Sequence, residues 1–174
     1  MKNLEIERKY LIKMPDLIQL EKLSSKVLKI TQTYIGKTEN GFNGRIRKII
    51  SNEKTNYMLT LKKRVGGITR QENEYEIDKE TYDNLLKRKQ KETRTIEKTR
   101  YCINENGFVY EIDVYSFWNK ISTMEIELEN ENIVPPIPNF VQIIDDVSEN
   151  GNFTNFRLSI NTPDENSILR EKTP

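Results

Sequence analysis

The chain has 174 residues, which is enough for one domain with a hydrophobic core. Its 28 Lys and Arg residues nearly balance its 27 Asp and Glu residues, and a net charge of +1 argues against a nucleic-acid binder that works by bulk attraction. The absence of histidine excludes a His-based catalytic triad, a His-ligated zinc and a His general base.

Cysteine content and hydropathy indicate a cytoplasmic protein. Cys102 is the only cysteine, so the chain forms no internal disulfide. The charged N-terminus lacks the apolar core of a signal peptide, and no apolar run approaches the roughly 20 residues that span a bilayer. We therefore expect no membrane partner, and we expect a monomer or a homodimer.

Charged and apolar residues alternate through the first half of the chain, which predicts strands. Asn40-Gly41, Asn43-Gly44 and Gly66-Gly67 mark turns, the last of them a hairpin. A short helix is expected over 15–24, where Pro15 and Asp16 open it. Strands are expected over 2–12, 27–38, 44–50 and 57–64, followed by a return strand that contains Arg70 and Ile77.

The second half begins with the main helix, over 79–91, for which Asp78 is the expected N-cap. Strands are expected over 94–103, 108–117 and 121–130. Three prolines between 135 and 138 then break regular structure, and a short helix is expected near 139–146. From about residue 155 the chain is polar, and we expect a loosely held tail within a single domain over 1–174.

Eight strands joined mostly by short turns favour an antiparallel sheet. A sheet of this length either packs on another layer or closes into a barrel. The sequence thus predicts an α+β protein dominated by antiparallel β structure, with a few flanking helices.

The polar faces of these strands carry both acids and bases. One face of each strand collects the in-phase charged residues, which are Glu5, Glu7, Lys9, Arg45, Arg47, Lys62, Arg64, Arg70, Glu72, Glu74, Glu76, Lys98, Arg100, Glu111, Asp113, Glu125, Glu127 and Glu129. Such alternation is also the ordinary pattern of a half-solvated strand. A solvated surface, however, has no reason to collect acids on some strands and bases on others.

If these faces meet across a lumen, the charges must pair or bind a ligand, because burying them unpaired is costly. Carboxylate oxygens suit Mg²⁺ or Mn²⁺, and clustered Arg and Lys suit phosphate. The two sets together are what a metal-assisted phosphoryl site requires.

The sequence resembles the CYTH superfamily, the triphosphate tunnel metalloenzymes, which includes inorganic tripolyphosphatases, thiamine triphosphatases and class IV adenylyl cyclases. Glu5-Ile6-Glu7-Arg8-Lys9 is similar to the family's Glu-x-Glu-x-Lys signature. The resemblance covers about residues 3–130 in order and continues through Arg45-Ile46-Arg47, Leu59-Thr60-Leu61-Lys62, Arg70-Gln71-Glu72-Asn73-Glu74, Glu97-Lys98-Thr99-Arg100-Tyr101, Glu111-Ile112-Asp113 and Glu125-Ile126-Glu127. It implies an eight-stranded closed tunnel.

The resemblance also implies roles for individual residues. Lys9, Arg45, Arg47, Lys62, Lys98 and Arg100 would bind the triphosphate. The metal candidates are Glu5, Glu7, Glu111, Asp113, Glu125 and Glu127, and the catalytic candidates are Glu7, Glu72, Glu74 and Asp113. For each of these residues the alternative role is a structural ion pair inside the barrel.

The C-terminal region departs from the family pattern. Bacterial relatives carry a Lys/Arg-Tyr-Ser-Asn segment after a Val-Thr-like turn, and it supplies a further cation. The matching stretch here is 147–155, and Gly151 and Asn152 fall where the cations would be. Arg157, Arg170 or Lys172 would have to replace them.

Three functions remain open on the sequence. The first is a Mg²⁺- or Mn²⁺-dependent triphosphatase that cuts inorganic tripolyphosphate or a small organic triphosphate, with the water activated by the metal or by a carboxylate. The second is an adenylyl cyclase, which needs an adenine pocket that the sequence does not reveal. The third is a phosphate- or nucleotide-binding module with little turnover.

Overall fold

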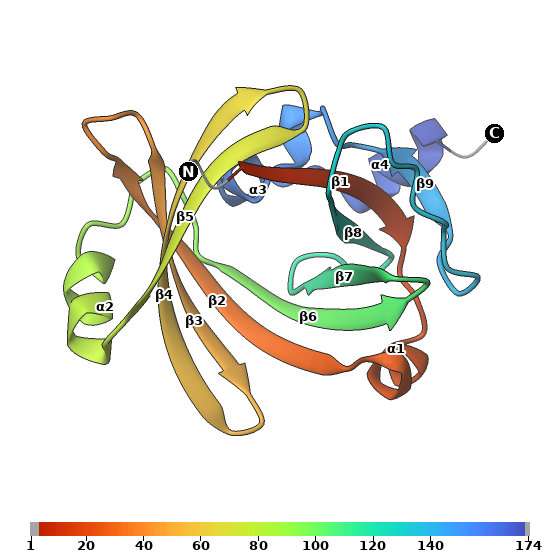
Figure 1. Ribbon diagram of the computed structural model, residues 1–174, viewed down its shortest axis with the longest axis horizontal. Helices are drawn as coiled ribbons and strands as arrows, with labels where there is room; N and C mark the ends of the chain where they lie inside the picture. Colours follow the sequence, from red (N-terminus) through yellow and green to blue (C-terminus); the bar gives the residue numbers. More distant parts are fainter. Residues whose placement is uncertain (1–3, 173–174) are drawn as a thin grey trace.

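The alternating sequence folds into long strands, as predicted. The computed structural model describes residues 4–172, so the first two residues of the strand expected over 2–12 lie outside the described residues (Figure 1). The first eight strands are β1 (Leu4–Lys13), β2 (Lys26–Lys37), β3 (Asn43–Ser51), β4 (Lys54–Gly66), β5 (Thr69–Ile77), β6 (Ile96–Glu105), β7 (Phe108–Tyr115) and β8 (Ile121–Leu128).

These eight strands form a closed antiparallel barrel, which confirms the predicted fold class. Their order in the sheet is β5-β4-β3-β2-β6-β7-β8-β1, and β1 closes the ring by pairing with β5. The closing seam is short, because it joins Leu4–Ile6 of β1 to Thr69–Gln71 of β5. From Ile6 onward β1 pairs along its other edge with β8.

A ninth strand replaces the helix expected near 139–146, so that prediction was wrong. The strand is β9 (Ile143–Asp146), and it pairs with Tyr10–Ile12 on the edge of β1 that β5 leaves open. Two consecutive isoleucines favour a strand, and the free hydrogen-bonding edge of β1 gives it a partner. Four residues are too few to show the periodicity by which helix and strand are told apart.

The two helices of the first half begin at the predicted aspartates. α1 (Leu17–Leu23) is capped by Asp16, which accepts hydrogen bonds from the amides of Ile18 and Gln19. α2 (Lys79–Leu86) is capped by Asp78 and ends five residues before the expected end at 91. It covers the outside of β2, β3 and β4 (Figure 1). Tyr82 of this helix packs on Tyr57 of β4.

The main hydrophobic core lies on the outer face of the barrel. Its residues alternate with the charged ones, so β1 contributes Tyr10 and Ile12, β7 contributes Tyr110 and Ile112, and β8 contributes Met124, Ile126 and Leu128. Leu20 of α1 and the proline-containing segment that includes Ile133, Phe140 and Val141 cover this face. Period-two alternation therefore leaves the charged set pointing inward.

A second apolar cluster fills one end of the barrel. Leu11, Ile96, Tyr115 and Ile121 each continue the inward-facing row of their strand, and they pack against residues from the C-terminal segment, Val147, Leu158 and Ile168. The C-terminal segment consists of the 3-10 helix Gly151–Phe153, α3 (Asn155–Ile160) and α4 (Glu165–Lys172). In place of the loosely held tail expected from about 155, these helices bury apolar side chains. None of the helices in residues 4–172 has the length and hydrophobicity needed to cross a bilayer.

We expect the outer core to determine stability. Ile112 is fully buried, and Ile112→Ala should lower the free energy of unfolding by about 2–5 kcal/mol through lost burial and a cavity. The control is Val109→Ala in the same strand, where the side chain is 47% exposed and the change should stay within about 0.5 kcal/mol. Denaturant unfolding measures both, and equal losses would contradict this assignment of the core.

Candidate active site

The charged rows face a cavity of about 440 Å³ inside the barrel, within the range of roughly 300–1,000 Å³ typical of small-molecule sites. Its lining includes every predicted site residue except Asp113. The predicted residues that line it are Glu5, Glu7, Lys9, Arg45, Arg47, Lys62, Glu72, Glu74, Lys98, Arg100, Glu111, Glu125 and Glu127. The barrel therefore gathers into one space side chains that lie as far apart in the sequence as Glu5 and Glu127.

Lys62 lies among three carboxylates near the closing seam. Its Nζ is 2.5 Å from an oxygen of Glu5, 2.8 Å from one of Glu72 and 3.4 Å from one of Glu7. One ammonium thus faces three acids. Burial raises the pKa of Glu5 to about 7, and the like charges of Glu72 and Glu7 add to this effect against the opposing influence of Lys62. Arg45 shares Glu72 with Lys62, and Arg70 lies opposite Glu5, so acids and bases are nearly balanced in this part of the cavity.

The register of β1 and β8 brings two acids together. Glu7 lies directly opposite Glu127, and like charges in that position destabilise a sheet. Carboxylate oxygens brought together in this way suit a hard divalent cation such as Mg²⁺ or Mn²⁺. Within residues 4–172 no three acidic groups are gathered into a ready-made metal site, because the acids of β1 turn toward Lys62. The donor chemistry fits a metal, and binding one requires Glu5 and Glu7 to turn away from that ammonium.

Arg100 is the centre of a second cluster, on β6, β7 and β8. Its guanidinium donates two hydrogen bonds of 2.7 Å to the carboxylate of Asp113, one of 2.6 Å to Glu125 and another to Glu111. Lys9 lies 2.8 Å from the other oxygen of Glu125. Each charge in this cluster is paired, and all but Glu111 are buried, so pairing is the condition under which the protein tolerates them.

Asp113 lies behind the cavity wall, fully buried beneath Arg100 and Lys98. Burial alone would raise the pKa of Asp113, but Arg100 and Lys98 hold it below the usual value. Burial lowers the pKa of Lys98 to about 8, despite the opposing charge of Asp113. The Asp113 carboxylate therefore pairs with Lys98 and Arg100 on the side away from the cavity and does not line the cavity itself.

The arginines of β3 pair with carboxylates of β5, across the intervening strand β4. Arg45 donates a 3.1 Å hydrogen bond to Glu72, and Arg47 bonds to Glu74 and to Thr60. Tight cross-strand pairs of this kind hold the guanidinium groups in fixed positions toward the cavity. Each of the six cations predicted to bind phosphate is thus paired with a carboxylate.

Two further arginines line the cavity beyond those predicted. Arg64 and Arg70 lie opposite each other in β4 and β5, and both donate to the carbonyl of Gly67, whose φ of +46° favours glycine in this hairpin. Burial and the neighbouring Arg64 lower the pKa of Arg70. Both were in phase with the charged faces in the sequence, so the signal for them was present.

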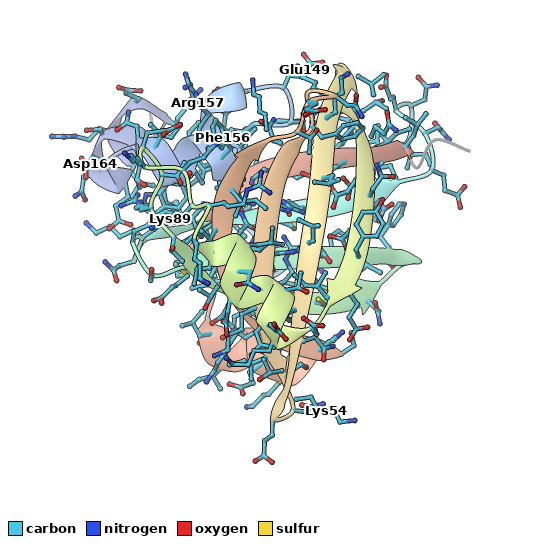
Figure 2. All side chains as sticks on the ribbon, turned by 90° about the vertical axis from the view of Figure 1, so that its left-hand side faces the viewer. Lys54, Lys89, Glu149, Phe156, Arg157 and Asp164 are labelled. Carbon is cyan, nitrogen blue, oxygen red and sulfur yellow. The ribbon has the colours of Figure 1, made fainter. Side chains whose placement is uncertain are left out.

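The C-terminal segment closes over the cavity but brings no cation to it. Figure 2 shows Glu149, Phe156 and Arg157 at the end of the barrel opposite Lys54. Val147–Gly151 and Thr154–Phe156 line the cavity, whereas Arg157 is exposed outside the lining.

The other two proposed replacements also lie elsewhere. Lys172 pairs with Asp145 at 3.0 Å, and Arg170 donates to Ser167. None of the three candidate cations therefore compensates for Gly151 and Asn152.

Sequence reasoning missed the uncharged part of the lining. Gln32 and Tyr34 project from β2, and Asn155 and Phe156 from the start of α3. The strand expected over 27–38 alternates poorly, which hid the inward direction of Gln32 and Tyr34. No local pattern in 155–156 indicates that a helix near the C-terminus reaches the barrel interior.

Comparison with known proteins connects the barrel and its lining to a family. The model of the CYTH domain matches residues 3–147. No curated protein matches the chain. Among solved structures, the inorganic triphosphatase NE1496 is 25% identical, with a TM-score of 0.54, over 92% of this chain and 97% of that one. A conserved hypothetical protein, Pfu-838710-001, from Pyrococcus furiosus is 23% identical, with a TM-score of 0.55, over 74% of this chain and 80% of that one.

The similarity to the Pyrococcus furiosus protein supports the fold alone. The similarity to the inorganic triphosphatase NE1496 extends over nearly the whole of both chains. The family match covers most of the sequence, including β1 to β9, and it agrees with the charged strands that the structure closes into a barrel. The chain belongs to the CYTH domain family.

Proposed function

We propose that the protein is a divalent-metal-dependent triphosphatase. The observation that carries the proposal is the single cavity lined by both a row of carboxylates and at least eight Lys and Arg side chains. The near full-length similarity to a protein described as an inorganic triphosphatase supports it. Cations alone would favour a binding module, and the additional carboxylates are what hydrolysis requires.

In this proposal the phosphate oxygens take the place of the carboxylates now bonded to the cations. Lys9, Lys62 and Lys98 act as point charges, and Arg45, Arg47 and Arg100 offer paired N–H donors. A triphosphate carries enough charge to replace several carboxylates at once. The exchange therefore needs side-chain rotation only, because the cations already point into the cavity.

Glu5, Glu7, Glu125 and Glu127 would hold Mg²⁺ or Mn²⁺, with Glu111 as a further candidate. When bound, the metal neutralises charge on the phosphate oxygens. In this proposal the remaining acids, Glu72 and Glu74, orient the attacking water and accept its proton, since the chain has no histidine. A new P–O bond forms to that water as the bond to the leaving phosphate oxygen breaks.

Asp113 has a different role in this proposal from the one that its sequence motif suggests. Full burial beneath Lys98 and Arg100 makes it a positioning residue for these two cations. Its carboxylate fixes their direction toward the phosphates.

We expect Glu7→Gln to abolish hydrolysis while the protein stays folded. Wild-type protein should release phosphate from tripolyphosphate, ATP or thiamine triphosphate with Mg²⁺ or Mn²⁺ and not with EDTA. The variant should lose at least 100-fold in rate, because an amide neither holds a cation nor orients water as a carboxylate does.

The matched control is Glu97→Gln on the exposed side of β6, which should keep the wild-type rate. If folded wild-type protein binds tripolyphosphate without releasing phosphate, the protein is a binding module and the proposed activity is wrong. If it forms cyclic AMP from ATP, the protein is a cyclase.

We expect Asp113→Asn to destabilise the protein through the cations that it leaves unpaired. Removing one partner of a buried ion pair costs about 3–5 kcal/mol, and denaturant unfolding should show a loss of this size. Asp83→Asn is the control, since Asp83 pairs with Lys79 on the surface of α2 and its loss should cost less than about 0.5 kcal/mol. Similar losses in both variants would contradict the positioning role.

A further inference from the structure

Two acids of β5, Glu72 and Glu74, share the role of orienting the attacking water in the proposed function. They lie two residues apart on the same face of the strand, and both line the cavity. A carboxylate that accepts a proton needs an oxygen that other groups leave free. The partners of the two acids therefore indicate which of them is suited to this step.

Glu72 has a cation on each of its carboxylate oxygens. Arg45 donates a 3.1 Å hydrogen bond to Oε1, and Nζ of Lys62 lies 2.8 Å from Oε2 in an ion pair without hydrogen-bond geometry. A proton taken up by Glu72 would break one of these pairs and leave a partly buried cation without its partner, which is costly. Glu72 is therefore suited to hold the two cations and poorly suited to accept a proton.

Glu74 has both of its donors on a single oxygen. Its Oε1 accepts a 2.8 Å hydrogen bond from the hydroxyl of Thr60 and another from Arg47. Its Oε2 has neither a hydrogen bond nor an ion pair with any residue in 4–172. The Glu74 side chain is also 38% exposed, against 12% for Glu72, so water reaches it more readily. Oε2 of Glu74 is therefore free to bind a water and to take its proton.

The hydroxyl of Thr60 bridges the two side chains that meet at Oε1. Thr60 is fully buried in β4, where the register places it opposite Glu74 on one side and opposite Arg45 on the other. Its Oγ1 donates to Glu74 and accepts a 3.3 Å hydrogen bond from Arg47. A β-branched side chain has few rotamers, so the hydroxyl stays in place. Thr60 therefore holds Glu74 by the oxygen that is not needed for proton transfer.

We propose that Glu74 is the acid that accepts the proton and that Thr60 is its positioning residue. With Oε1 held by Thr60 and Arg47, Oε2 orients the attacking water. The water oxygen forms a bond to the terminal phosphorus, its proton passes to Oε2, and the electron pair of the broken P–O bond stays with the leaving phosphate. This inference rests on the proposed function and assigns to Glu74 the role that it shares there with Glu72.

A purely structural role for Thr60 makes a different prediction. A buried hydroxyl finds hydrogen-bond partners in almost any protein, so the bonds of Thr60 alone do not separate the two roles. If the hydroxyl only satisfies buried groups, its loss lowers stability and leaves the turnover of the folded enzyme unchanged. If the hydroxyl positions Glu74, its loss lowers kcat while the cations that bind the phosphates, and hence KM, are little affected.

The first test removes the hydroxyl and keeps the shape of the side chain. The substrate is whichever of tripolyphosphate, ATP and thiamine triphosphate the wild type hydrolyses fastest with Mg²⁺. We expect Thr60→Val to lower kcat by about tenfold or more, the effect of losing one hydrogen bond to a charged group, and to change KM by less than about threefold. Thr60→Ser restores the hydroxyl and should recover kcat to within about threefold of wild type.

The matched control is Thr33→Val. Thr33 is also fully buried, its hydroxyl bonds to that of Thr95 at 3.0 Å, and it lies outside the cavity lining. This variant loses one buried hydrogen bond, as Thr60→Val does, and should keep the wild-type kcat and KM. A folded Thr60→Val enzyme with the wild-type kcat would overturn the positioning role, as would an equal fall of kcat in Thr33→Val.

The second test shows whether Thr60 acts through Glu74. In a Glu74→Gln background, adding Thr60→Val should lower kcat by less than about twofold, because the carboxylate that Thr60 holds is already gone. In a Glu72→Gln background the same change should cost the full factor of about tenfold. The reverse pattern would assign the proton to Glu72, and equal costs in both backgrounds would show that Thr60 acts through neither acid, so either result overturns the proposal.

The failure of this inference is distinguishable from the failure of the proposed function. An active wild type whose kcat is insensitive to Thr60→Val overturns the role of Thr60 alone and leaves the triphosphatase standing. A folded wild type that hydrolyses none of the three triphosphates overturns the proposed function, and the assignment of Glu74 as proton acceptor with it.

Discussion

The structure depends on how a barrel accommodates many charges in its interior. Ions removed from water must be paired, and six cations of the lumen meet this requirement. They are Lys9, Arg45, Arg47, Lys62, Lys98 and Arg100, and each pairs with a carboxylate. These pairs are weak evidence for stability, because apolar side chains would fill the same space at lower cost. Retaining the charges makes sense if a charged ligand exchanges with them, as the proposed function requires.

Strand register determines which charges meet. A slip of one residue would turn Glu5, Glu7 and Lys9 outward and bring Tyr10 and Ile12 into the lumen, so the apolar outer core holds the register that the site requires. The same register places Glu7 opposite Glu127 and Lys9 opposite Glu125. Glu7 and Glu127 carry like charges, so a cation beside them is favourable. Lys9 and Glu125 carry opposite charges and neutralise each other. Packing on the outside of the barrel therefore sets the electrostatics on the inside.

The sequence predicted the features that follow from local periodicity. Alternation predicted the eight strands and the inward direction of nearly all charged site residues, and Asp16 and Asp78 predicted two helix starts. The sequence-based prediction failed where tertiary contacts determine the local structure. Ile143–Asp146 form a strand because they pair with the edge of β1. Leu158 and Ile168, from a segment of polar composition, pack into the open end of the barrel. Gln32 and Phe156 escaped notice because a neutral side chain in a charged lumen leaves no charge pattern to detect.

Because the cations are already paired with carboxylates, an anion that binds in the cavity must break some of these ion pairs. Arg100 alone bonds to three carboxylates, so a ligand gains little by displacing one of them. An anion must reach Arg45, Lys62 and Lys9 on three different strands to compensate for the pairs that it breaks. If the cavity binds phosphates as proposed, a monophosphate would replace too few contacts, whereas a chain of phosphates would pair with several cations and leave the carboxylates of β1 and β8 for a metal. Exchange of one charge network for another would then discriminate between anions by the length of the phosphate chain.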